Sequence, residues 1–252
     1  AGLPYAKQGL DLLMSRKRSL VRPEQRFLGS LTILLPVWNE AKVLSQKLDN
    51  LMETCQGFDS HLVIIDSAST DASVSIVEEW TGQSAFASYT LLRMKERKGK
   101  TAAVKQALEH INQSITTDLI LMTDADALFE TDTVSKLMHW FSDSTIGCVG
   151  ASPKRLGQRT EEVEHRALFS MVRNMESKFD STPFLEGSCM MWRREALDVE
   201  SLNVMSNADD AQIATNVRIN GLRAIQDSES YFIDHAPHHR KEHARQKVRR
   251  AQ

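Results

Sequence analysis

The chain has 252 residues, of which 41% are hydrophobic, enough to build the packed core of a large α/β domain. Its formal net charge of -2 argues against a nucleic-acid binder, which would need a strongly basic surface. The cysteines Cys55, Cys148 and Cys189 lie far apart and form no C-x-x-C pair. This spacing argues against a zinc site or a disulfide framework and favours a reducing setting.

The first thirty residues predict an amphipathic, basic helical segment. Leu3, Leu10, Leu13 and Met14 recur at helical spacing, and arginines and lysines follow them. Such a segment either lies on an anionic membrane surface or packs on the domain, and the sequence leaves both open. The chain begins without a methionine and ends in a basic stretch, so we expect it to be part of a longer protein.

From residue 31 onward, short apolar runs alternate with amphipathic helical segments, which is typical of an α/β fold with a mostly parallel central sheet flanked by helices. Asn39 is expected to cap the first helix and Asp71 the second. The predicted strands are 31–35, 61–65, 88–93, 118–123 and 146–151, and the predicted helices are 40–53, 71–81, 101–112 and 132–141.

The alternation weakens in the second half of the chain. A charged helical stretch at 160–179 leads to a glycine-containing segment at 184–192, and a further helix is predicted at 209–219. No linker rich in Pro, Gly or Ser separates the halves. We therefore expect two lobes, 31–130 and 131–252, that share one continuous sheet.

Polar residues follow three of the predicted strands. The loops are Pro36 to Glu40, Asp66 to Asp71, and Asp124 to Asp126. Ligands of open parallel sheets bind where the carboxyl ends of the strands converge, so the three loops are expected to line one edge.

Asp124 and Asp126 leave the end of an apolar strand one residue apart. Two such carboxylates can hold a hard divalent cation, Mg²⁺ or Mn²⁺, together with phosphate oxygens. The cation would offset the charge of a departing diphosphate. A D-x-D sequence also occurs by chance in surface turns, but its place at a strand end beside two other acidic loops favours the metal site.

Other residues of this edge allow two interpretations. Asp66 is suited to bind a base or a ribose hydroxyl, or else to cap a turn, and Asn39 and Glu40 share this ambiguity. Lys100 precedes a helix and could neutralise phosphate together with the helix N-terminus. Met94 stands where a Walker A loop requires glycine, which excludes that motif.

Two later segments add charged candidates. In Ala208-Asp209-Asp210, one acid could remove the proton from an attacking acceptor hydroxyl, or both could serve the dipole of the helix they open. Near the end of the chain, Arg249 or Arg250 could clamp a diphosphate. His238 or His239 is either an extra metal ligand or part of a partly solvated surface cluster.

With these motifs in order, the chain resembles the inverting family-two glycosyltransferases of the GT-A fold, which include dolichyl-phosphate sugar synthases and the cellulose and hyaluronan synthases. The resemblance covers about residues 31 to 250. Its elements are P-V-W-N-E, D-S-A-S-T-D, G-K before a helix, T-D-A-D, E-G-S followed by M-W-R-R-E-A-L, A-D-D, and Q-K-V-R-R. It implies that 31–130 binds the nucleotide sugar and 131–252 the acceptor.

The resemblance also implies a role for each matched position. Asp210 is the implied general base, and Asp209 replaces the family's usual glutamate beside it. Arg250 stands where the Q-x-x-R-W pattern has tryptophan, which argues against processive synthesis, because that ring stacks beneath the acceptor sugar. The resemblance also implies that Pro36, Glu40 and Asp66 contact the base and ribose. It implies that Asp124 and Asp126 contact the ribose, the diphosphate and the metal, with Asp126 the more direct metal ligand. The implied diphosphate segment contains Gln246, Arg249 and Arg250.

We therefore expect an enzyme that moves one sugar from a UDP- or GDP-sugar to a hydroxyl or phosphate acceptor, with Mg²⁺ or Mn²⁺. The resemblance further implies a lipid-linked or glycan acceptor at the cytoplasmic face of a membrane. The alternatives are a processive polysaccharide synthase, a non-catalytic module that binds nucleotide sugars or a partner protein, and a sugar-phosphate nucleotidyltransferase. The last normally has a glycine-rich loop after its first strand, where this chain has Pro36 to Glu40.

Overall fold

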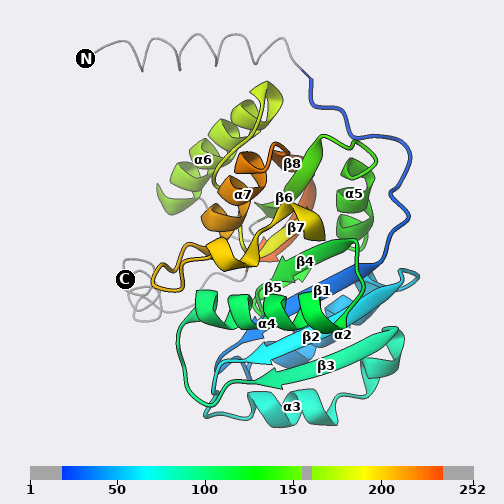
Figure 1. Cartoon of the computed structure of the whole chain (residues 1–252), viewed down its shortest axis with the longest axis vertical. Coiled ribbons are helices and arrows are strands. Elements are labelled where there is room, and N and C mark those ends of the chain that lie inside the picture. Colours follow the sequence, from blue (N-terminus) through cyan, green and yellow to red (C-terminus); the bar gives the residue numbers. More distant parts are fainter. Residues whose placement is uncertain (1–18, 155–160, 235–252) are drawn as a thin grey trace.

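The computed structural model describes residues 19–154 and 161–234, with only the backbone of 161–167 and of 234. One eight-stranded sheet runs through these residues in the order β3-β2-β1-β4-β7-β6-β8-β5, with helices on both sides (Figure 1). The predicted continuous sheet is confirmed. Its strands are β1 (Leu31–Val37), β2 (Ser60–Asp66), β3 (Ser88–Arg93), β4 (Leu119–Thr123), β5 (Ala127–Phe129), β6 (Ile146–Lys154), β7 (Cys189–Arg193) and β8 (Arg223–Asp234).

The helices fall close to the predicted segments. Each of α2, α3 and α4 connects two successive parallel strands of the first half, while α6 and α7 belong to the less regular second half. Their bounds are α2 (Leu44–Thr54), α3 (Ser73–Glu79), α4 (Lys100–Ser114), α5 (Thr133–Trp140), α6 (Glu161–Phe179) and α7 (Asp209–Ile219), and short 3₁₀ turns occupy Thr81–Ala85, Arg194–Ala196 and Val199–Ser201.

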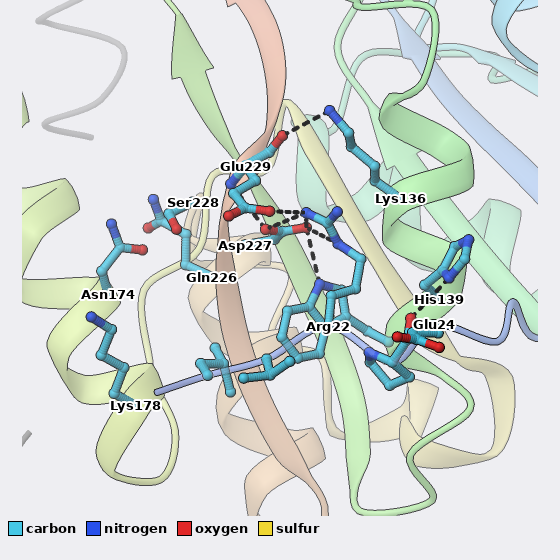
Figure 2. A pocket seen from close by; sticks show the side chains of 14 residues that line it. Arg22, Glu24, Lys136, His139, Asn174, Lys178, Gln226, Asp227, Ser228 and Glu229 are labelled. Carbon is cyan, nitrogen blue, oxygen red and sulfur yellow. Dashed lines mark hydrogen bonds and ion pairs between the residues drawn. The ribbon is translucent and has the colours of Figure 1, made fainter. Parts of the chain in front are cut away.

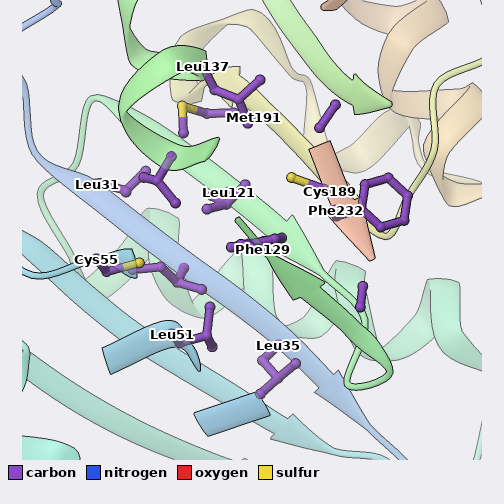
Figure 3. Packing of buried hydrophobic residues seen from close by; sticks show 14 of the residues in the cluster. Leu31, Leu35, Leu51, Cys55, Leu121, Phe129, Leu137, Cys189, Met191 and Phe232 are labelled. Atoms are coloured by element: carbon purple, nitrogen blue, oxygen red, sulfur yellow. The ribbon is translucent and has the colours of Figure 1, made fainter. Parts of the chain in front are cut away.

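The first four long strands are parallel: β1 pairs with β2 and β4, and β2 pairs with β3. Helices cover both faces, which explains why β1 and β4 read as nearly continuous apolar runs rather than as alternating patterns. One face packs against α2 and α5, and the other against α4 and α7. Figure 3 shows the core on the first of these faces, where Leu51 of α2 and Leu137 of α5 belong to one cluster with Phe129 of β5.

The second half of the sheet departs from the parallel pattern. β7 runs antiparallel to both β4 and β6, while β8 is parallel to β6 and antiparallel to β5. The sequence analysis did not identify β5, β7 and β8 as strands. β5 has three residues, and β8 contains the polar run Gln226 to Ser230, so neither carries a clear periodic signal.

The described part of the N-terminal segment, residues 19–30, has neither helix nor strand, and the helix expected near residues 3–14 lies outside the described residues. Arg22 of this segment forms a bidentate pair with Asp227 of β8, at 2.8 to 3.2 Å (Figure 2). The indole of Trp140 also donates to Asp227, at 2.9 Å. This pair borders a cleft of about 460 Å³ between the segment, α5, α6 and β8. No helix among the described residues is both long and apolar enough to cross a membrane.

The Arg22–Asp227 pair gives a prediction for stability. Asp227 is 2% exposed, and replacing it leaves the Trp140 indole without its acceptor and the Arg22 guanidinium with only the exposed Glu229 carboxylate at 3.3 Å. We expect Asp227→Ala to lower the free energy of unfolding by about 3 kcal/mol in urea denaturation. The control is Arg218→Ala, which breaks the exposed pair with Asp180 and should cost no more than about 1 kcal/mol. Equal losses in the two variants would contradict the role given to burial.

Candidate active site

The parallel register brings three strand ends to one edge of the sheet. Leu34 of β1 is level with Val63 of β2 and with Met122 of β4. The loops that follow β1, β2 and β4 therefore leave the sheet on the same side. The acidic loops predicted to converge do so, and Asp66 and Asp126 lie at the same edge.

The loops after β1 and β2 are tied together by hydrogen bonds. Asn39 accepts from the backbone N–H of Thr70 at 2.8 Å, and its own N–H donates to Ser69 Oγ at 2.9 Å. Asp71 accepts from the N–H of Ala41 at 3.1 Å and from that of Ser73, the first residue of α3, at 2.9 Å. The two loops therefore form one unit.

This bonding corrects the prediction that Asn39 caps the first helix. α2 begins at Leu44, and residues 40–43 form a turn in which the Glu40 carbonyl accepts from Val43 and Leu44. Asn39 has a left-handed φ of 55° and directs its side chain to the neighbouring loop instead. Pro36 is also placed differently, inside β1, beyond the pairing with β4 that ends at Leu34.

Asp66 is the last residue of β2 and is 4% exposed. Its carboxylate accepts from the N–H of Ser69 at 3.1 and 3.3 Å, and this bond fixes the Asp66 side chain against the loop that follows β2. The structure thus shows the turn-forming contact that was one of the two interpretations of Asp66.

Lys100, the first residue of α4, connects the two halves of the site. Its ammonium lies 2.7 Å from Asp124 Oδ1 and 3.4 Å from Asp209 Oδ2. The second contact is an ion pair without hydrogen-bond geometry, since Asp209 Oδ2 accepts no hydrogen bond among the described residues. Asp209 is 3% exposed, so Lys100 supplies its positive neighbour.

Charge compensation decides the protonation of this pair. Burial alone would raise the pKa of Asp124, but the Lys100 ammonium and hydrogen bonds from Lys100 and Ser188 outweigh it and lower the pKa below its usual value. Burial alone would lower the pKa of Lys100, and Asp124 and Asp209 raise it instead. Both groups are therefore charged at neutral pH.

Asp210 has the opposite shift. Burial raises its pKa above the usual aspartate value, the neighbouring charge of Asp209 adds to this, and the N–H of Ala211 and the Lys100 ammonium oppose it. A Cβ added at Gly187 would lie 3.3 Å from Asp210 Cβ and 3.5 Å from Lys100 Nζ. Gly187 therefore allows its loop to pass directly beside the acids.

The sequence analysis missed two polar contributors to this edge. Ser188 Oγ donates to Asp124 Oδ2 at 3.0 Å, and only the E-G-S match pointed to its segment. Lys47 on α2 is completely buried and donates to Thr123 Oγ1 and to the Ala127 carbonyl. Burial lowers the pKa of Lys47 to about 8, and nearby thiols and acids limit the shift. Its spacing places Lys47 on the apolar face of α2, so no signal in the sequence marks it as a contributor to the site.

The donor set at Asp124 and Asp126 fits a hard divalent cation. Asp126 is half-buried in the turn between β4 and β5, and Asp124 retains 30% of its side-chain exposure. Partly exposed carboxylates suit Mg²⁺ or Mn²⁺ that also binds phosphate and water. The oxygens of Asp124 also bond Lys100 and Ser188, so a cation would share them. Within residues 19–154 and 161–234 no cluster of three or more His, Cys, Asp or Glu could hold a metal by itself. A cation here would share its coordination with a ligand.

The last group of predicted site residues lies outside the described part of the chain. This group comprises the candidate histidines and the diphosphate-binding segment. Its members are His238, His239, Gln246, Arg249 and Arg250.

Comparison with protein families matches residues 32–199 to "Glycosyl transferase family 2". The match covers well over half of the chain. The chain therefore belongs to glycosyl transferase family 2, as the motif resemblance predicted.

Two curated relatives illustrate the similarity. An N-acetylglucosaminyltransferase of Rhizobium leguminosarum bv. viciae is 28% identical over 177 residues, which are 67% of this chain and 40% of that protein. A dolichyl-phosphate beta-glucosyltransferase of Dictyostelium discoideum is 26% identical over 136 residues, 50% of this chain and 40% of that protein. The chain thus spans about 40% of the length of these relatives.

Solved structures confirm the GT-A fold. The mannosyltransferase PcManGT of Pyrobaculum calidifontis, in complex with GDP-Man and Mn²⁺, has a TM-score of 0.80 at 28% identity over 99% of this chain and 70% of that chain. S. aureus TarS in complex with UDP-GlcNAc has a TM-score of 0.62 at 16% identity over 83% of this chain and 60% of that chain, a likeness of fold alone.

The Lys100 contacts predict a pH-dependent stability. The pKa of Asp124 is lowered in the folded state, so its stabilisation is present above the unfolded pKa of about 3.9 and is lost as the pH falls through the folded value. The stability gap between wild type and Lys100→Met should therefore be widest near pH 7 in urea denaturation. It should shrink at acidic pH, because the buried carboxylate that has lost its cation in the variant takes up a proton before the wild-type carboxylate does. The control is Lys105→Met on the same helix as Lys100, which removes an ion pair with Glu200 of the turn Val199–Ser201. A Lys100 gap that does not change down to pH 3 would contradict this account.

Proposed function

We propose that this chain is the catalytic domain of an inverting glycosyltransferase that moves a single sugar from a nucleotide diphosphate sugar to a hydroxyl or phosphate acceptor. The supporting observation is the position of Lys100, which contacts Asp124 of the T-D-A-D turn and Asp209 of the A-D-D helix. The two motifs are 85 positions apart in the sequence, yet one ammonium touches both. Acids suited to the donor phosphates and to acceptor activation therefore meet at one point.

The donor is proposed to bind the loops of residues 31–130, with Pro36, Asn39, Glu40 and Asp66 beside the base and ribose. Lys100 would lie against the diphosphate, where its charge and the N-terminus of α4 both favour an anion. The GDP-Man bound to PcManGT supports a nucleotide sugar as the donor class. UDP- and GDP-sugars are both retained as candidates.

The divalent cation, Mg²⁺ or Mn²⁺, is proposed to bind Asp126 and Asp124. When bound, it would offset the negative charge that develops on the leaving diphosphate. The Mn²⁺ in the PcManGT complex supports this choice of cofactor. Gln246, Arg249 and Arg250 are proposed to reach the same diphosphate from the end of the chain.

Asp210 is proposed to act as the general base. Inversion requires that the acceptor loses its proton as it attacks the anomeric carbon, and a carboxylate within hydrogen-bond reach can take that proton. The raised pKa of Asp210 makes its carboxylate a stronger base than that of an ordinary aspartate. Asp209, held by Lys100, would orient the start of α7 and contact substrate.

The acceptor is proposed to be lipid-linked or a glycan, bound in the lobe of residues 131–252 at the cytoplasmic face of a membrane. The similarity to a dolichyl-phosphate beta-glucosyltransferase supports a lipid-linked acceptor. Arg250, in place of the family's tryptophan, supports single transfer over processive synthesis.

Asp210→Asn tests the base assignment. We expect kcat to fall by about 10² to 10⁴-fold while donor affinity, measured by calorimetry, is retained. In the wild type, kcat/KM should decrease as the pH falls through the raised pKa of Asp210, because the protonated carboxyl cannot accept the proton. The variant should lack this acid limb.

The matched control is Asp143→Asn, at the opposite edge of the sheet, where Asp143 accepts from Thr145. It should retain wild-type kcat. An Asp210→Asn enzyme with wild-type turnover would remove Asp210 from the base role.

Thermal-shift measurements test the donor and the metal. GDP- and UDP-sugars with Mn²⁺ are compared with each component alone, since a ligand that binds only the folded state raises the melting temperature. We expect one nucleotide to raise Tm with Mn²⁺ and to have little effect without it. Asp126→Asn should lose the Mn²⁺-dependent part of the shift. A Tm that responds to neither nucleotide nor metal would refute the proposed function.

A further inference from the structure

Lys47 is a buried lysine on the leucine-rich inner face of α2. The inner face of α2 carries Leu44, Lys47, Leu48 and Leu51, all completely buried and spaced as an amphipathic helix requires. Lys47 is therefore surrounded by core residues rather than extended to solvent.

The ammonium of Lys47 makes short contacts on both sides of the D-A-D turn. It donates to Thr123 Oγ1 at 2.8 Å and to the Ala127 carbonyl at 2.5 Å. Thr123 is the last residue of β4 and Ala127 the first of β5. The two hydrogen bonds thus fix the two ends of the turn that carries Asp124 and Asp126.

A second residue of α2 continues this contact along β5. Asn50, one turn further on, donates to the Phe129 carbonyl at 2.9 Å and accepts from the Phe129 N–H at 2.8 Å. The Lys47 ammonium also lies 3.9 Å from the centre of the Phe129 ring. Side chains of α2 therefore bond the edge strand β5 on one side, while β8, its pairing strand among the described residues, covers the other.

Stability alone does not explain a lysine at this position. Taking an ammonium out of water has an effective cost of several kcal/mol, and an apolar side chain of similar size would avoid it. Both hydrogen-bond acceptors of Lys47 are uncharged oxygens. What an apolar residue could not provide is the pair of hydrogen bonds across the turn.

We infer that Lys47 is a positioning residue of the proposed glycosyl transfer: from beneath the sheet edge it holds the Asp124-Ala125-Asp126 turn in the geometry that binds the divalent cation and the donor diphosphate. This inference rests on the proposed function. Polar partners that support metal ligands in this way typically change metal affinity by about 10 to 100-fold when removed.

The test is Lys47→Met, which keeps the length and removes both hydrogen bonds. Mn²⁺ alone is titrated by calorimetry, well below the melting temperature of each variant, and GDP and UDP are then titrated with Mn²⁺ present. We expect Mn²⁺ affinity to fall about 10 to 100-fold, and the KM of the donor to rise at a fixed Mn²⁺ concentration.

Arg193→Met is the matched control. Arg193 is a half-buried cation that donates to the carbonyls of Phe141, Asp143 and Ile146, and it lies at the other end of β7, away from the turn. It should lose stability but keep wild-type Mn²⁺ affinity. Thr123→Val, which removes one of the two acceptors of Lys47 and leaves the ammonium in place, should weaken Mn²⁺ binding in the same direction as Lys47→Met, and it serves if Lys47→Met fails to fold.

Unchanged Mn²⁺ affinity in Lys47→Met or, should that variant not fold, in Thr123→Val would overturn the inference while leaving the proposed function intact. Tighter binding would also overturn it, because it would show that the repulsion between the ammonium and the metal outweighs the positioning of the turn. A wild-type chain that binds neither Mn²⁺ nor nucleotide would refute the proposed function itself, and the inference with it.

Discussion

Like charges crowded at one sheet edge are the constraint around which this molecule is arranged. Two carboxylates about 4 Å apart repel by about 4 kcal/mol at the effective dielectric of a protein surface. Asp124, Asp209 and Asp210 all lie within the influence of the Lys100 ammonium, which contacts the first two directly. One cation therefore allows acids from distant parts of the chain to be neighbours, and it leaves Asp210, with its raised pKa, as the least compensated of the three.

The fold supports this arrangement from two sides. The N-terminus of α4 presents Lys100 after Gly99, whose φ of 95° permits the abrupt entry into the helix. On the other side, α2 reaches the turn between β4 and β5 through Lys47 and Asn50. The acidic turn is thus bonded by side chains of two helices, an arrangement that suits the divalent cation proposed to bind there.

Family membership and local geometry contribute different parts of the functional picture. The family and the GT-A fold define a scaffold on which many sugar donors and acceptors are used, so they do not select a substrate. The local geometry shows that Lys100 holds Asp124 charged, that the pKa of Asp210 is raised, and that one ammonium links the two acidic motifs. The second lobe is proposed to bind the acceptor.

The sequence by itself determined the parallel half of the sheet and the edge where the acids gather. Apolar runs buried on both faces can only be central strands, and residues that follow parallel strands necessarily leave the sheet on one side. The A-D-D helix was also predicted within its observed bounds, and the acids that open it favour the helix dipole. The assigned roles of Asp66, Asp126 and Asp210 stay predictions.

Only the tertiary structure decided how the site is held together. Asn39 was predicted to cap α2, yet its side chain bonds the neighbouring loop, because a turn at residues 40–43 delays the helix. The antiparallel strands β7 and β8 and the approach of Gly187 to Asp210 depend on contacts between distant segments, which no local pattern encodes. Lys47 is the clearest case: its spacing places it in the core, but which oxygens its charge meets there is fixed by how α2 packs against β4 and β5.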